Sequence, residues 1–71
     1  MGVVRFKRSS YGFIQCEGGD ALLLGHVYFN MRNLRRIVAR GDIQIGVRVS
    51  FRLGPSDIRG KPQQAIDIRL W

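Results

Sequence analysis

The stretch Ser9-Ser10-Tyr11-Gly12-Phe13-Ile14-Gln15-Cys16 joins a two-serine break to a clear alternation of side chains. Successive side chains of a β-strand point to opposite faces, so residues two apart share a face. The stretch then has an aromatic face and an apolar face, formed by Tyr11, Phe13 and Gln15 and by Gly12, Ile14 and Cys16. Because Ile14 and Cys16 already supply the apolar face, we expect the two rings to point outward.

Strand patterns lie on both sides of this stretch. Val3 to Arg8 is rich in strand-forming residues, and the serines separate it from Tyr11 to Cys16 as in a hairpin. Val27 to Met31 alternates again, with Tyr28 and Asn30 on one face. We therefore expect a third strand there.

The second half of the chain contains two further strand patterns. Val47 to Leu53 and Ala65 to Leu70 alternate, and the side chains expected to face inward are Val47, Val49, Phe51, Leu53, Ile66, Ile68 and Leu70. Between the third and fourth strands, Arg32 to Arg40 carries apolar residues at helical spacing and is followed by Gly41. This segment predicts a short helix or a turn.

Five short strands separated by turn signals indicate an all-β fold. The length of 71 residues fits one domain, residues 1–71. Short, evenly spaced strands are typical of a small closed or partly closed antiparallel barrel, and closure removes exposed strand edges. A chain of this size buries only about 60% of its unfolded surface, so its stability is expected to be marginal.

The charge of the chain indicates a polyanionic partner. Twelve Lys and Arg residues against five Asp and Glu give a net charge of +7, and ten of the twelve are arginines. A guanidinium stacks on rings and binds phosphate through two parallel hydrogen bonds. Single-stranded RNA or DNA is the simplest partner for such a chain.

Several classes of protein are disfavoured by the composition. Cys16 and His26 are the only cysteine and histidine, so neither an internal disulfide nor a zinc site is expected. They have no evident orienting carboxylate, and no phosphate-binding glycine loop is present, so we expect neither an enzyme nor a cofactor. The sequence has no long apolar run and no signal-like start, which predicts an intracellular, cytoplasmic protein.

Rings and cations share the first three expected strands. Phe6, Tyr11, Phe13 and Tyr28 are fringed by basic residues, a combination typical of proteins that stack single-stranded bases. Simple alternation places Phe6 on the same face as Val4 and does not say which face of this strand points outward. A β-bulge near Lys7 would reconcile the two positions.

The order of these motifs resembles that of the cold-shock domain. Gly2-Val3-Val4-Arg5-Phe6 and Tyr11-Gly12-Phe13-Ile14 resemble its opening and first ribonucleoprotein motif, and Val27-Tyr28-Phe29-Asn30 its second. Gly46 with Val49-Ser50-Phe51 resembles the fourth strand of the family. Gly60-Lys61-Pro62-Gln63-Gln64-Ala65, followed by Asp67-Ile68, resembles the end of the domain.

The resemblance implies a five-stranded Greek-key barrel of the oligonucleotide-binding class that binds single-stranded RNA or DNA with little sequence selectivity. It differs from the family pattern at Asn30, where a stacking histidine is usual, and at Ser10, where a glycine is usual. Stacking positions correspond to the four rings, and phosphate contacts to Arg5 and Arg59. The residues expected to bind nucleic acid are Arg5, Phe6, Lys7, Arg8, Tyr11, Phe13, Tyr28, Asn30, Arg59 and Lys61.

Two alternatives remain open in the sequence. Asp20 to Leu24 could itself be the third strand, which would remove Tyr28 from the ring surface. If it is not, Leu22, Leu23 and Leu24 form an apolar loop that either binds a protein partner or a second copy, or folds over one end of the barrel. The alternative function is accordingly a protein-interaction module that docks on a ribosome or a polymerase through these leucines or through Arg32 to Arg40.

Overall fold

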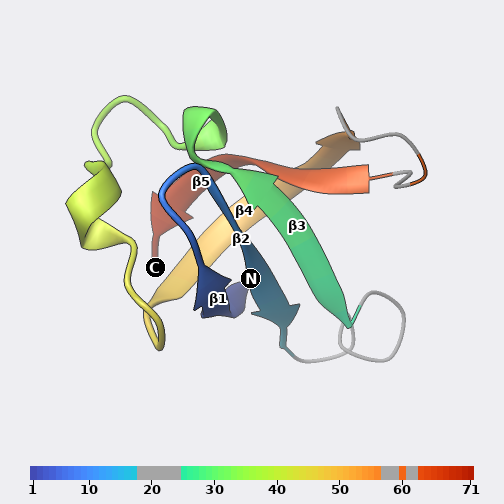
Figure 1. Cartoon of the computed structure of the whole chain (residues 1–71), viewed down its shortest axis with the longest axis horizontal. Helices are drawn as coiled ribbons and strands as arrows, with labels where there is room; N and C mark the ends of the chain where they lie inside the picture. Colours follow the sequence, from blue (N-terminus) through green and yellow to red (C-terminus); the bar gives the residue numbers. More distant parts are fainter. Residues whose placement is uncertain (18–24, 57–59, 61–62) are drawn as a thin grey trace.

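The computed structural model describes residues 1–17, 25–56, 60 and 63–71 of the chain. Within these residues five antiparallel strands form one sheet with the order β3-β2-β1-β4-β5 (Figure 1). The elements are β1 (Gly2–Lys7), β2 (Tyr11–Cys16), β3 (His26–Asn30), the short 3-10 helices η1 (Met31–Asn33) and η2 (Arg40–Asp42), β4 (Arg48–Pro55) and β5 (Gln63–Leu70). The prediction of an all-β, five-stranded antiparallel fold is confirmed.

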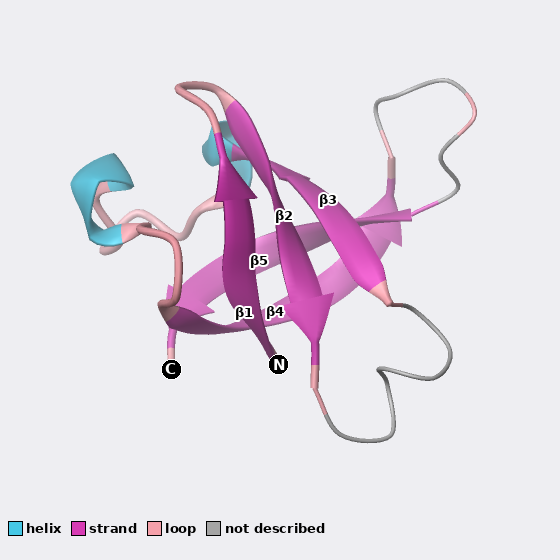
Figure 2. Cartoon of the chain, turned by 60° about the horizontal axis from the view of Figure 1, so that its bottom comes forward, coloured by secondary structure: helices cyan, strands magenta, loops and turns pink. Residues whose placement is uncertain are grey.

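The sheet is strongly bent. In Figure 2, β4 and β5 cross behind β1, β2 and β3, and the core lies between the two groups of strands. β3 also contacts β5. No ladder between the described residues joins β3 to β5, so these two strands are the ends of the observed order. The core residues are Val4, Ile14, Cys16, Val27, Phe29, Met31, Val38, Ile43, Val49, Ala65 and Ile68.

The third strand lies at one of the two positions that the sequence left open. β3 pairs with β2 in a register that places Tyr28 opposite Phe13 and Asn30 opposite Tyr11. The predicted strand at residues 27–31 is therefore confirmed with a shift of one residue, because Met31 begins η1. Asp20 to Leu24 lie outside the described residues.

A bulge in β1 places Val4 and Phe6 on opposite faces of the sheet. Val4 pairs with Ile14 and Phe6 with Phe13, so Arg5 is one extra residue in β1. An extra residue reverses the side on which the following side chain emerges. Val4 is buried accordingly, whereas Phe6 is 36% exposed. The bulge expected near Lys7 is present at Arg5.

Gly12 has no room for a side chain between β2 and its two neighbouring strands. It lies opposite Phe29 of β3 and Lys7 of β1. A Cβ at this position would stand 2.8 Å from the Phe29 ring and would overlap the carbonyl oxygen of Phe6. That oxygen belongs to the backbone of a paired strand and cannot turn aside as a side chain would. A side chain at Gly12 therefore requires the hairpin to shift.

Replacing Gly12 should lower stability even when the new side chain is only a methyl group. We expect Gly12→Ala to reduce the free energy of unfolding by about 1–3 kcal/mol, measured by urea denaturation. Gly41→Ala is the matched control, because a Cβ at Gly41 would meet nothing within 4 Å. The control should stay within about 0.5 kcal/mol of the parent protein. Equal losses in the two variants would contradict the close approach at Gly12.

β5 contains a second bulge that changes the expected inward face. Ser50 pairs with Arg69 but Arg52 pairs with Ile66, so β5 has one more residue than β4 in this interval. Asp67 occupies the bulge with φ 51°, a left-handed conformation that Asp tolerates better than most residues. Ile66 consequently lies opposite exposed Arg52 and is half-buried, whereas Ile68 is buried.

The prediction that Leu53 and Leu70 face the core is wrong. Leu53 is 36% exposed and Leu70 is 46% exposed. Leu53 lies on the part of β4 that extends beyond its short pairing with β1, which involves only Arg48 and Val49. Leu70 is the last residue of β5, at the end of the sheet order. Among the described residues, no further strand packs over either side chain.

The segment predicted as a helix or a turn consists of turns. It contains η1 and η2 at its ends, and no α-helix lies between them. Leu34 is held against β5 by a bridge to Ile68. Val38 is buried in the core, whereas its neighbour Ile37 is 88% exposed. None of the helices in the described part of the chain has the length and apolarity needed to cross a membrane.

Candidate functional site

Four rings gather on the outer face of β1, β2 and β3. We call Phe6, Tyr11, Phe13 and Tyr28 the aromatic cluster. Its ring centroids are separated by 5.8 Å for Phe6 and Phe13, 6.0 Å for Phe6 and Tyr11, and 6.3 Å for Tyr11 and Phe13. The rings are tilted or edge-on to one another, which is the preferred geometry of aromatic pairs. The sequence prediction that Phe6, Tyr11, Phe13 and Tyr28 lie together is confirmed.

Tyr28 differs from the other three rings in its exposure. Its ring contacts Tyr11 and Phe13 at centroid distances of 6.0 Å each. It is only 7% exposed, whereas Phe6 is 36% exposed and Tyr11 and Phe13 are half-buried. Tyr28 therefore supports the neighbouring rings from the side and offers little surface of its own.

A shallow depression crosses the aromatic cluster. It has a volume of about 530 Å³ and is lined by Arg5, Phe6, Tyr11, Phe13 and His26. His26 lies in β3 two residues before Tyr28 and opposite Gln15 of β2. His26 is not among the predicted site residues, because the predicted third strand begins at Val27. The strand period would have identified it had the strand been started one residue earlier.

Two arginines are held at the edge of the aromatic cluster. The Nε–H of Arg5 donates to Gln15 Oε1 over 2.7 Å, which uses one of its five N–H groups. The guanidinium carbon of Arg8 lies 5.1 Å from the centroid of the Phe6 ring. That geometry is a cation–π contact, worth about 0.5–1 kcal/mol at an exposed site. Both cations are thus positioned beside surfaces on which a planar group could lie.

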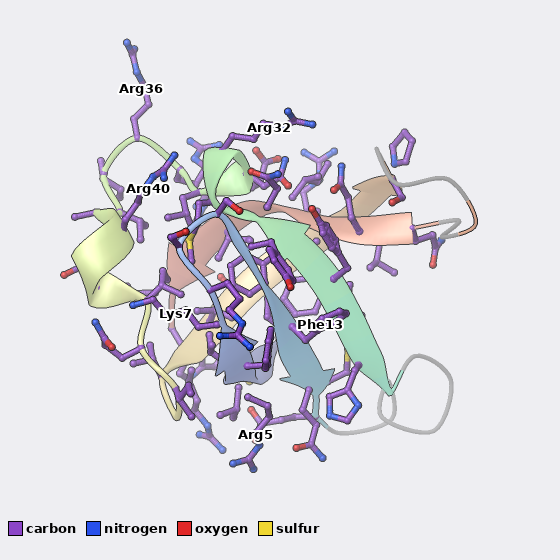
Figure 3. All side chains as sticks on the ribbon, viewed as in Figure 1. Arg5, Lys7, Phe13, Arg32, Arg36 and Arg40 are labelled. Atoms are coloured by element: carbon purple, nitrogen blue, oxygen red, sulfur yellow. The ribbon has the colours of Figure 1, made fainter. Side chains whose placement is uncertain are left out.

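Lys7 stands apart from the depression. Lys7 is half-buried and is not among the residues that line it, and Figure 3 shows Lys7 on the opposite side of β1 and β2 from Phe13. Arg59 and Lys61 lie outside the described residues, as do Leu22, Leu23 and Leu24. Arg5, Phe6, Tyr11 and Phe13 line the depression itself.

Asn30 has a structural role at the border of the aromatic cluster. Its Oδ1 accepts a hydrogen bond from the Arg32 backbone N–H over 3.0 Å, and its own N–H donates to Asn33 Oδ1 over 3.2 Å. These reciprocal bonds cap η1. The Asn30 amide also lies 3.5 Å from the Tyr28 hydroxyl. Asn30 therefore fixes the turn that follows β3, next to the cluster.

In the described part of the chain, no group of three or more His, Cys, Asp or Glu side chains lies close enough together to hold a metal ion. Cys16 is 2% exposed in the core, as its place on the apolar face of β2 predicted.

Fold and site together define a small all-β protein with an exposed aromatic cluster on a five-stranded antiparallel sheet. Comparisons with models of known protein families, with curated proteins and with solved structures found no match.

Proposed function

We propose that the protein binds single-stranded RNA or DNA without catalysing a reaction. Bases stack on Phe6, Tyr11 and Phe13, while arginines at the edge of the aromatic cluster contact the phosphates. The observation that carries the proposal is the combination of three accessible rings about one ring-width apart with Arg5 and Arg8 beside them. The net charge of +7 supports a polyanionic ligand.

The size of the surface is adequate for useful affinity. Stacking of a base on an aromatic side chain is worth about 1–3 kcal/mol, so three rings supply about 3–9 kcal/mol before the cost of ordering the strand. Micromolar binding requires about 8 kcal/mol. Phosphate contacts from the arginines supply the remainder at low salt. Bases held on the rings cannot pair, so the bound strand is kept open.

The resemblance to the cold-shock domain supports the same function. In that family a five-stranded barrel carries stacking rings on its first three strands, where the aromatic cluster lies here. We propose that the sheet of this protein closes in the same way, since β3 and β5 are in contact. The protein would then act as an RNA chaperone or as a regulator of transcription or translation.

Substitution of Phe13 tests the proposal, because this ring contacts the other three members of the cluster. We expect Phe13→Ala to weaken binding of a short labelled oligopyrimidine by about 1–3 kcal/mol, or about 5- to 150-fold. Fluorescence anisotropy measures the affinity for the DNA and RNA forms. Phe13→Tyr keeps the ring and should retain most of the affinity.

The salt dependence separates stacking from charge. With about four phosphate contacts, the logarithm of the affinity should fall against the logarithm of salt with a slope of about −3. Phe13→Ala should lower the affinity without changing this slope. Binding that survives Phe13→Ala undiminished would mean that charge alone is responsible. Absence of binding by the parent protein would reject the proposal.

A further inference from the structure

A second group of cations lies where the segment after η1 meets β5. A hollow of about 510 Å³ is lined there by Leu34, Arg35, Arg36, Ile37, Asp67 and Arg69. We call it the arginine hollow. It shares no lining residue with the depression on the aromatic cluster. Figure 3 shows Arg36 and Arg5, one from each site, at opposite ends of the molecule.

Backbone contacts hold the two sides of the arginine hollow together. The N–H of Arg35 donates to the carbonyl oxygen of Ile68 over 2.9 Å, and Leu34 forms a bridge with the same residue. The bulge of β5 presents Asp67 beside this junction with φ 51°. The relative positions of Arg35 and Asp67 therefore follow from the fold and do not depend on flexible side chains alone.

Asp67 orients two of the guanidinium groups. Its Oδ2 lies 3.1 Å from Arg52 Nη1, and its Oδ1 lies 3.8 Å from Arg35 Nη1. Arg36 and Arg69 line the same hollow. Two guanidinium groups thus approach the Asp67 carboxylate, and the four arginines together with Asp67 carry a net charge of +3. Arg36 and Arg69 are exposed and face water.

The chemistry of the arginine hollow favours phosphate as its ligand. A guanidinium presents its N–H groups in a planar fork that matches the oxygens of a phosphate. A phosphodiester backbone carries such groups at regular intervals, so one strand can contact several arginines at once. A strand already stacked on the aromatic cluster also brings its remaining phosphates to this surface at high effective concentration.

We propose that the arginine hollow binds phosphate groups of a nucleic-acid backbone, at a site separate from the aromatic cluster. One protein molecule then holds a strand by its bases on one face and a second segment by its phosphates at the other. The inference rests on the proposed function in taking nucleic acid as the ligand, and the bridging of two segments also needs the stacking surface. Its consequence is that the protein bridges two segments instead of only covering one.

The test uses a short oligodeoxyribonucleotide without bases, which offers phosphates but cannot stack. We expect Arg36→Ala/Arg69→Ala to weaken its binding about tenfold at low salt and to reduce the log–log salt slope by about 1.4, or 0.7 for each contact. Arg40→Ala/Arg48→Ala removes the same charge at residues that do not line the hollow. This control should change the affinity less than about threefold.

Nuclear magnetic resonance locates the bound probe. Addition of the base-free oligonucleotide should shift the backbone amide signals of Arg35 and Asp67, and Arg36→Ala/Arg69→Ala should suppress those shifts. Equal weakening by the two double variants would overturn the site in favour of overall charge. Equally tight binding of polyglutamate of matched length would overturn the assignment to phosphate.

The outcomes also separate this inference from the proposed function. Phe13→Ala should leave binding of the base-free probe unchanged while it weakens binding of the oligopyrimidine. If Phe13→Ala has no effect on the oligopyrimidine but Arg36→Ala/Arg69→Ala abolishes the amide shifts, the arginine hollow stands and the stacking surface fails. The reverse result rejects the arginine hollow alone.

Discussion

Phe29→Ala is expected to lower the free energy of unfolding by about 3–5 kcal/mol, the range for removal of a fully buried aromatic side chain. Phe29 has no exposed surface and is the largest of the fully buried side chains. Its ring lies under Gly12 of β2 and belongs to the core.

The effect of Phe29→Ala is large in relation to the stability of a chain this short. Domains are stable by about 5–15 kcal/mol, and small ones lie near the lower limit. Circular dichroism during urea denaturation should show a midpoint close to zero denaturant or no folded baseline. Phe6→Ala makes the same change at a ring that is 36% exposed and should cost less than about half as much. Similar losses for the two variants would contradict the assignment of faces.

The part of the fold nearest the N-terminus could be predicted from local pattern. The alternation of Tyr11 to Cys16 is strict, and each residue of its apolar face is buried. Two serines then suffice to predict a hairpin, which the bond from the Arg8 N–H to the Tyr11 carbonyl closes over 2.7 Å. Local pattern was informative here because one face of β2 contributes to the core and the other does not.

The bulges limited what the sequence could predict. One extra residue reverses the face of every later side chain in the strand. In β1 the conflict between Val4 and Phe6 revealed the bulge, because both residues are large and apolar. In β5 the alternation of Ile66, Ile68 and Leu70 looked regular, and nothing marked Asp67 as a residue with positive φ. The bulge there became visible only from the pairing with β4.

The sequence predicted which rings form the site, but not how much of each side chain is exposed. Rings on adjoining strands identify a cluster, yet the area each ring presents depends on how neighbouring side chains pack. Tyr28 is enclosed by that packing, whereas His26 is exposed and lines the depression. The arginine hollow could not be predicted, because Arg35 and Asp67 are distant in sequence and meet through the bulge of β5.

The largest effect on binding is expected from removal of two of the three accessible rings. Phe6→Ala/Phe13→Ala should weaken binding of the oligopyrimidine by about 2–4 kcal/mol, or about 30- to 700-fold, because two stacked bases lose their partners. The loss should be smaller than the sum of the single losses. The two ring centroids are 5.8 Å apart, so each single substitution also disturbs the other ring.

Double-variant analysis distinguishes a stacking surface from a general apolar patch. Ile45→Ala/Leu70→Ala is the matched control, since these side chains are 65% and 46% exposed and line neither the depression nor the arginine hollow. The control should bind the oligopyrimidine as the parent does, within about twofold. Additive losses from Phe6→Ala and Phe13→Ala would mean that the rings act on separate bases without supporting each other. Removal of both rings leaves Tyr11 as the one accessible ring of the aromatic cluster. Unchanged affinity in Phe6→Ala/Phe13→Ala would therefore show that bases do not stack on the cluster.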